Sequence, residues 1–170
     1  VQTTAPILDR TFGQGSGQGY IALAAGSIKN ATDEPDSTIA SAAQGALSFT
    51  VTPGSPDPQV LILHTHATET YQTWDTPVYD ARTKDTTLNM CAVGEAMTKV
   101  LNDAGITTLH DTTLHDSPSY TESYARSAQT ARRYLEEYPS IKVVLDVHRD
   151  AMESGDARVR PLTMLDGQPT

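Results

Sequence analysis

The sequence predicts an α/β fold: a single domain in which helices flank a twisted, mostly parallel sheet. Two short apolar runs, residues 60–63 and 141–147, have the length and the β-branched content of buried strands. Between them lie two stretches whose apolar residues recur at helical spacing. At 170 residues the chain is long enough for one domain with a core and too short to argue for two. The predicted fold class follows from this alternation of strand and helix.

The N-terminal part carries weaker signals. Residues 1–19 are rich in Gly, Gln and Thr, which predicts a flexible lead-in rather than a packed element. The folded domain is expected to begin near Tyr20 and to extend over residues 20–170. Residues 20–23 and 46–51 predict short strands, with a polar connection between them.

From residue 60 onwards, strands and helices alternate. A helical stripe of apolar residues follows the first strand and is expected to end at Gly105. Residues 106–109 predict a short strand, and a second helix is expected to begin at Ser117 and to end before Pro139. Parallel strands joined by right-handed crossovers end at the same edge of a sheet. That edge is predicted to carry five polar side chains: His64, His66, His110, Asp111 and His148.

The composition excludes several kinds of partner. The net charge is −9 and the isoelectric point is about 4.8, and the sequence has no cluster of Lys and Arg of the kind that binds nucleic acid. No apolar stretch is long enough to span a membrane. The chain begins at Val1 without a methionine or a leader, so we expect a targeting segment to have been removed. Cys91 lies in an apolar helical stripe and is predicted to be a small buried hydrophobe.

Histidines and a carboxylate at one sheet edge suggest a zinc site. Catalytic zinc is held by three protein ligands of this kind and keeps one position open. Residues two apart in a strand face the same way, so His64 and His66 can both reach one metal, or one can bind while the other orients substrate. By the same rule Asp146 shares a face with His148 and is expected to hold its imidazole. The candidate ligands are His64, His66, Glu69 and His148.

Two loops offer further candidates. His110 and Asp111 are followed five residues later by a second His-Asp pair, a pattern that helical metal-dependent phosphohydrolases also use. Because this stretch connects a strand to a helix, we favour structural roles, with His110 lining the cleft and Asp116 capping the next helix. The loop after Glu69 contains several aromatic and basic residues: Tyr71, Trp74, Tyr79, Arg82 and Lys84. Such a loop can form one wall of a substrate site or an exposed cover over the sheet, and we favour the wall of a substrate site.

Five motifs in order together resemble the stage II sporulation protein P family, and the likeness spans most of residues 20–155. The motifs are H-T-H-A-T-E-T-Y at 64–71, N-M-C-A-V-G-E-A-M at 89–97, G-I-T-T-L-H-D-T-T-L-H-D at 105–116, S-Y-T-E-S-Y-A-R-S at 119–127 and L-D-V-H-R-D-A at 145–151.

This resemblance implies a zinc-dependent peptidoglycan hydrolase, an N-acetylmuramoyl-L-alanine amidase that is also credited with cleaving peptide cross-links. It implies work outside the cytoplasm of a spore-forming bacterium, at the septal or engulfing membrane, during engulfment of the forespore. The implied partners are peptidoglycan and the stage II sporulation proteins D and M. An N-terminal membrane anchor, also implied, is not in this sequence. Residues 20–170 then correspond to the catalytic domain.

The fold is similar to that of the broader cell-wall zinc amidases, whose ligands are a histidine after the first strand, a glutamate, and a histidine after a later strand. His148 matches the last of these, and His64 or His66 the first, with His66 slightly favoured. The glutamate corresponds either to Glu69, as ligand or proton carrier, or to a position near Asp85, and we favour Glu69.

The residues after His148 are expected to complete the site. Arg149 is positioned to hold a substrate carboxylate, although a solvent-exposed ion pair with Asp150 is nearly as good an interpretation. Asp150 is, with Glu69, a candidate to move the proton. The broader amidases carry a further glutamate on a later strand. Here residues 159–165 predict a strand followed by a hairpin turn with no partner strand, so we expect a C-terminally truncated, incomplete domain.

The alternative to a zinc amidase is a non-catalytic module that binds the cell wall or acts as a scaffold in the engulfment machinery. In that case the histidines at the sheet edge would bind sugar or a partner protein, and no metal would be retained.

Overall fold

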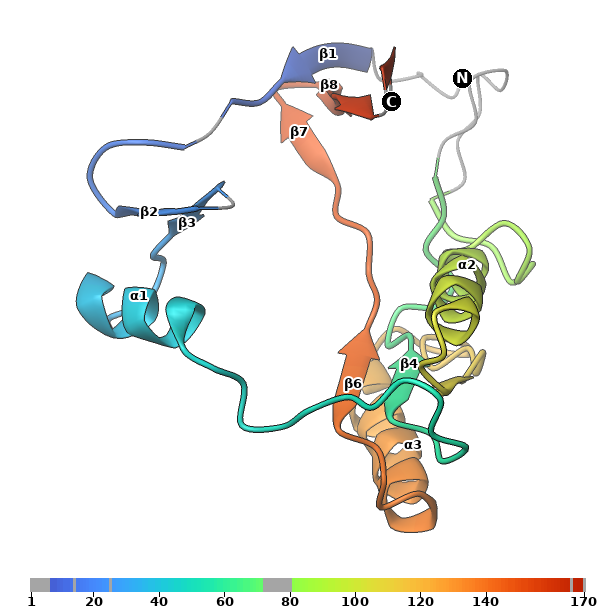
Figure 1. The fold of residues 1–170 in the computed structure, drawn as a ribbon. Helices are drawn as coiled ribbons and strands as arrows, with labels where there is room; N and C mark the ends of the chain where they lie inside the picture. The colour runs from blue at the N-terminus through green and yellow to red at the C-terminus, as the bar shows by residue number, and fades with distance from the viewer. Residues whose placement is uncertain (1–6, 14, 25, 72–80, 166, 170) are drawn as a thin grey trace, which may run out of the picture. The chain divides into compact units, whose positions relative to one another are not determined.

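The structure, a computed structural model, describes residues 7–13, 15–24, 26–71, 81–165 and 167–169. These residues form two compact units (Figure 1). The central unit is the described part of Phe49–Asp150, and the terminal unit comprises the described parts of Ala5–Ser48 and Ala151–Thr170. Each unit is described by itself.

The central unit is built on a three-stranded parallel sheet. The middle strand is β4 (Val60–Leu63), and it pairs with β5 (Thr108–His110) on one side and β6 (Val143–Asp146) on the other. All four residues of β4 are buried, because two strands flank it and helices pack on the sheet. Val60 is in register with the first residue of both neighbours, so the three strands end at the same edge, as predicted.

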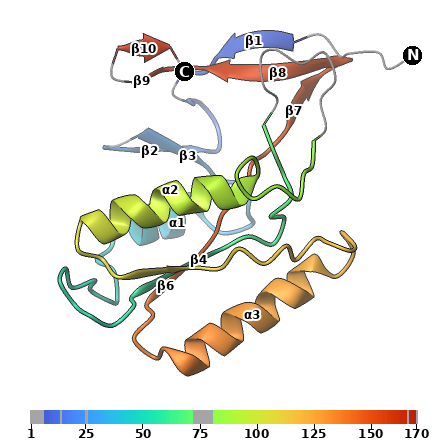
Figure 2. The same cartoon turned by 90° about the vertical axis from the view of Figure 1, so that its right-hand side faces the viewer.

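Two helices enclose this sheet, one on each side of β4 and β6 (Figure 2). Helix α2 (Met90–Asp103) begins where the Asn89 side chain accepts a hydrogen bond from Cys91 N, and Gly105, with φ +80°, provides the left-handed residue that ends it. Helix α3 (Ser123–Glu137) ends before Pro139 as expected, but the start predicted at Ser117 is wrong.

The segment before α3 stays non-helical for two reasons. Glu122 adopts a left-handed conformation with φ 66°, which breaks the helical path at that residue. The Arg126 side chain also donates hydrogen bonds to the carbonyls of His115, Ser119 and Thr121, so this loop is tied to the first turns of α3.

The core of the central unit lies between β4 and α3. Leu61, Leu63 and Ile141 are buried together, and partly buried apolar residues pack around them: Leu109, Ala131, Tyr134 and Tyr138. Cys91 is buried as predicted, and burial raises the pKa of its thiol to about 11. A thiol in that state is a packing residue and not a nucleophile.

The terminal unit joins the two ends of the described chain. Strand β1 (Ile7–Thr11) pairs in parallel with β8 (Ala157–Leu162), which pairs on its other side with β7 (Met152–Ser154). Strand β1, which is mostly exposed, therefore lies within residues 1–19, where the sequence predicts a flexible lead-in. The expected strand over residues 159–165 is also not left unpaired, because β1 and β7 flank β8, and β9 (Met164–Leu165) pairs with β10 (Gln168–Pro169).

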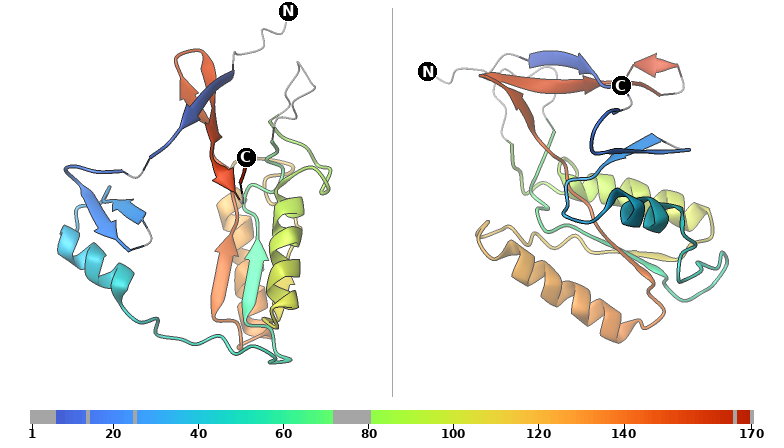
Figure 3. Two further views of the ribbon diagram at one scale, coloured as in Figure 1. Left: turned by 45° about the horizontal axis from the view of Figure 1, so that its top comes forward. Right: turned by 90° about the vertical axis from the view of Figure 1, so that its left-hand side faces the viewer.

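The rest of the terminal unit contains a hairpin and a helix. β2 (Tyr20–Leu23), which was predicted, pairs with β3 (Gly26–Lys29), and α1 (Asp36–Gln44) lies beside this hairpin (Figure 3). The strand predicted over residues 46–51 does not form, and Leu47 is exposed. Among the described residues, no helix is both long enough and apolar enough to cross a membrane.

Candidate metal centre

The segment after β4 is a buried turn and not a continuation of the strand. Glu69 N donates to His66 O at 3.1 Å, which closes the turn and brings the Glu69 side chain toward the His66 ring. Thr70 N donates to Ala81 O and Thr83 N donates to Thr68 O, so a second segment runs alongside. Because the strand ends at Leu63, alternation no longer governs the side chains that follow, and His64 and His66 point to different places.

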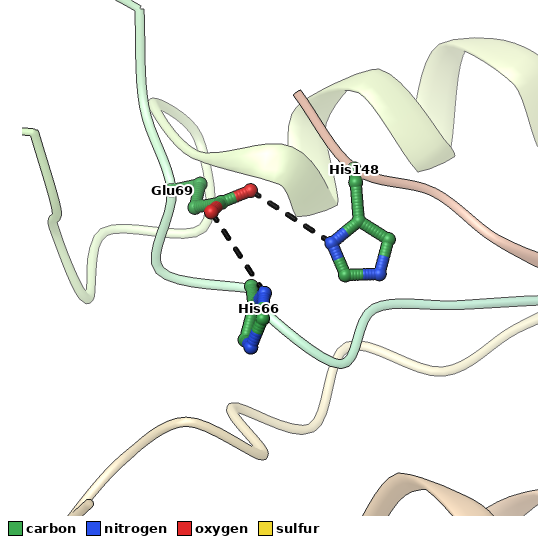
Figure 4. A group of neighbouring side chains, drawn as sticks. All are labelled: His66, Glu69 and His148. Atoms are coloured by element: carbon green, nitrogen blue, oxygen red, sulfur yellow. Dashed lines mark ion pairs between the residues drawn. The ribbon is translucent and has the colours of Figure 1, made fainter. Parts of the chain in front are cut away.

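Three of the predicted ligands meet in one cluster, which we call the His-Glu-His cluster: His66, Glu69 and His148 (Figure 4). The Glu69 carboxylate lies between the two imidazoles, with Oε1 3.8 Å from His66 Nδ1 and Oε2 3.9 Å from His148 Nδ1. One ligand atom from each residue lies within 4.8 Å of the others. His66 and Glu69 are buried, whereas the His148 side chain is 30% exposed, so the cluster opens toward solvent on the His148 side.

The donor set of this cluster fits zinc. Two imidazoles and a carboxylate are ligands that zinc takes in catalytic sites, and here one ligand atom from each lies within 4.8 Å of the others. In addition, His66 Nε2 is buried and has no hydrogen-bond partner in the part of the chain that the structure describes. The nitrogen of His66 that faces Glu69 is the other one, Nδ1, which is therefore the candidate ligand atom of this ring (Figure 4).

His148 is oriented by Asp146, the contact that the sequence predicted. Asp146 Oδ1 lies 3.1 Å from His148 Nε2, and the same carboxylate accepts hydrogen bonds from Thr65 N at 2.8 Å and Thr65 Oγ1 at 2.6 Å. Burial alone raises the pKa of Asp146, but hydrogen bonds from Thr65 and His148 outweigh it and lower the pKa. An ionised Asp146 accepts a hydrogen bond from Nε2–H of His148, which leaves Nδ1 of His148 as the candidate ligand atom.

The His66 ring is held neutral. Burial is the largest cause of its lowered pKa; Glu69 acts in the opposite direction, and the nearby His148 and Arg82 reinforce the lowering. A neutral imidazole is the form that binds a metal ion.

His64 lies outside the His-Glu-His cluster and pairs with His110. Its Nδ1 donates to Val147 O at 2.9 Å, since a carbonyl can only accept, and its Nε2 lies 3.0 Å from His110 Nε2. The His110 side chain is only 5% exposed and its Nδ1 lies 3.2 Å from Glu95 Oε2. Gly94 makes room for this His64–His110 pair, because a Cβ there would come within 2.4 and 2.5 Å of the two Nε2 atoms.

The remaining predicted residues also lie outside the cluster. Arg149 donates from Nε to Thr70 O and from Nη2 to Ala81 O, so its guanidinium braces the two segments beside the metal centre, while its backbone N lies 3.4 Å from Glu69 Oε2. Asp150 is exposed. Asp85 is exposed too, and its Oδ1 accepts hydrogen bonds from Thr87.

Only part of the aromatic wall predicted after Glu69 lies within the described residues. Tyr71 is exposed, and Trp74 and Tyr79 lie outside the described residues. Other tyrosines take the place beside the ligands: the Tyr120 ring stacks on His66 at 4.4 Å between centroids, and Tyr124 meets the same ring edge-on at 5.2 Å. We did not predict these two positions, although both lie in the motif at 119–127 that carries the family resemblance.

A comparison with models of protein families identifies a family for this chain. The model of the family described as stage II sporulation protein P (SpoIIP) matches residues 20–170. No curated protein and no solved structure matches the chain. The family has a role in sporulation, at engulfment of the forespore, and is associated with peptidoglycan hydrolysis. Since the match covers far more than half of the sequence, the chain belongs to the stage II sporulation protein P family.

Proposed function

We propose that this chain is a zinc-dependent N-acetylmuramoyl-L-alanine amidase. The observation that supports this function is the His-Glu-His cluster at the carboxyl edge of a parallel sheet, the place where open α/β sheets build their sites. In a family associated with peptidoglycan hydrolysis, the substrate of such a centre is a bond of the cell wall. The proposed bond is the amide between the lactyl group of muramic acid and L-alanine.

Each residue of the centre has a proposed part. His66, Glu69 and His148 hold the ion, and three protein ligands leave a position open for the reacting groups. When bound, zinc supplies Lewis acidity, which polarises the scissile carbonyl and makes a water molecule more acidic. Asp146 fixes the orientation of His148. Asp150, exposed two residues after His148, is the proposed carrier of the proton to the leaving amine.

The substrate is proposed to contact the two tyrosines beside the ligands. Tyr120 is 58% exposed and Tyr124 is 62% exposed, although both contact the buried ring of His66. Exposed aromatic rings offer apolar contact area and a hydroxyl to a sugar or peptide. The amide of the proposed substrate is joined to the sugar ring through the lactyl group, so the sugar would lie close to the residues of the centre.

The cellular setting is proposed from the family. We place the protein outside the cytoplasm, anchored at the septal or engulfing membrane, with the stage II sporulation proteins D and M as partners. Cleavage of peptide cross-links is proposed as a second activity of the same centre.

Digestion of purified peptidoglycan tests the proposed reaction. We expect release of stem peptides with a free L-alanine amino group, loss of release with a chelator, and recovery on addition of zinc. His148→Ala and Glu69→Gln should abolish release, whereas Asp85→Asn, an exposed carboxylate outside the cluster, should leave it unchanged. Release that is indifferent to chelation would contradict the metal assignment, and a purified chain without near-stoichiometric zinc would favour the wall-binding alternative.

A further inference from the structure

One guanidinium contacts both a metal ligand and a deeply buried carboxylate. Arg82 Nη2 lies 3.4 Å from Glu69 Oε1, and Arg82 Nη1 lies 2.6 Å from Asp116 Oδ2. We propose that Arg82 is a positioning residue of the metal centre, which holds Glu69 and His66 in place and is itself anchored by Asp116. This inference rests on the metal site of the proposed function.

Asp116 is the fixed end of this arrangement. Its side chain is 0% exposed, and it accepts hydrogen bonds from Thr68 N at 3.2 Å and from Thr68 Oγ1 at 2.6 Å. A buried carboxylate requires a cation and hydrogen bonds to offset its lost hydration, and Arg82 supplies the cation. The predicted role of Asp116 as a helix cap is therefore wrong: it binds the turn that carries the ligands, and α3 begins at Ser123.

Arg82 reaches Glu69 from a neighbouring segment of backbone. The two residues form an antiparallel bridge, and Thr83 N donates to Thr68 O at 2.7 Å just beside it. The backbone therefore fixes where the Arg82 side chain starts, and Asp116 fixes where it ends. While one nitrogen of the guanidinium contacts Asp116, the other contacts Glu69 Oε1. This is the same oxygen that faces His66 Nδ1.

Arg82 reaches His66 through an aromatic ring. Its Cζ lies 5.0 Å from the centroid of the Tyr120 ring, and that ring stacks on His66 with an interplanar angle of 18°. Two of the three ligands therefore depend on one side chain. A planar fork can serve two carboxylates and a ring at once, whereas a lysine ammonium is a single point charge on a flexible stem.

Zinc titration of the full chain tests this inference without any substrate. We expect Arg82→Lys and Arg82→Gln to weaken zinc affinity by about 10–100-fold, the usual effect of losing a group that orients a metal ligand. Arg133→Lys is the matched control, because Arg133 also pairs with an aspartate, Asp111, but is 65% exposed and contacts no member of the cluster. Competition with a chromophoric chelator gives the affinities, and thermal melting without zinc shows whether each variant is folded.

A double-mutant cycle tests the anchoring. Asp116→Asn should also weaken zinc binding, and Arg82→Gln combined with Asp116→Asn should weaken it by less than the product of the two single effects, because both changes remove the same restraint. For a folded Arg82→Lys variant, saturating zinc should restore cleavage toward the wild-type rate, since a positioning residue acts only through the ligands.

Two results separate this inference from the proposed function. Wild-type zinc affinity in folded Arg82→Gln overturns the inference and leaves the proposed function untouched. A wild-type chain that binds zinc with the expected dependence on Arg82 but releases no peptide contradicts the proposed function and leaves the inference standing.

Discussion

His64 and His66 lie two residues apart after the same strand, yet their surroundings differ in one decisive respect. Both ring nitrogens of His64 have partners, Val147 O and His110 Nε2. His66 has one nitrogen facing Glu69 and another that is buried without a hydrogen-bond partner among the described residues. The comparison teaches that burial alone does not distinguish the two histidines, whereas the groups beside the ring do, because only His66 lies next to both Glu69 and His148.

The largest expected effect separates the two histidines directly. His66→Ala should remove near-stoichiometric zinc, because it deletes one of three ligands, while His64→Ala should retain zinc and lose thermal stability through the cavity it leaves. Elemental analysis and melting curves of the two variants give the answer. If His64→Ala loses its zinc while it stays folded, the two histidines are not separate in function.

A smaller loss is expected when the orientation of His148 is disturbed. Asp146→Asn should weaken zinc affinity by about 10–100-fold, because the amide no longer holds the His148 ring as an ionised carboxylate does. Zinc competition measures the change. Unchanged affinity would show that His148 is positioned by its backbone alone.

The His64–His110 pair can be disturbed without touching the cluster. Gly94→Ala places a Cβ against both Nε2 atoms and should lower the free energy of unfolding by about 1–3 kcal/mol, as overpacking typically does. Urea unfolding measures the change in the free energy of unfolding. Zinc affinity in folded Gly94→Ala should stay at the wild-type value; a large loss would link the pair to the cluster.

The smallest expected effect is a pH dependence of the metal-free chain. The pKa of both His64 and His66 lies below the ordinary value of 6.5, mainly through burial. The unfolded chain therefore binds protons first as the pH falls through 6.5, and the stability of the folded chain should decline below that pH and be fully present above it. Urea midpoints at pH 8 to about pH 5 test the sign, and a rise in stability on acidification would contradict it.

Much of the central unit could be predicted because its signals are local. β4 and β6 are short apolar runs, and parallel strands end together, which was enough to bring His66 and His148 to one edge. The same reasoning failed for His64, because it treated the residues after Leu63 as strand. Only the hydrogen bond from Glu69 N to His66 O shows that the chain turns there.

The contacts that could not be predicted join residues far apart in sequence. Arg82 and Asp116 are 34 positions apart, and no sequence pattern in either loop predicts their contact. Strand β1 was missed for the same reason, since its partner β8 lies about 150 residues away and a Gly-rich neighbourhood hides it. A pairing of this kind is decided by tertiary structure rather than by local preference.

The pairing of β1 with β8 also sets an order of events during synthesis. All of the central unit is translated between these two strands, so β1 leaves the ribosome long before its parallel partner exists. The sheet that carries the His-Glu-His cluster consists of strands that lie within residues 60–146. It can therefore form before the partner strand of β1 has been synthesised. The β1–β8 pairing therefore has to wait until Ala157–Leu162 has been synthesised, and an interruption of translation before Ala157 leaves the residues of the His-Glu-His cluster synthesised but β1 without its neighbour.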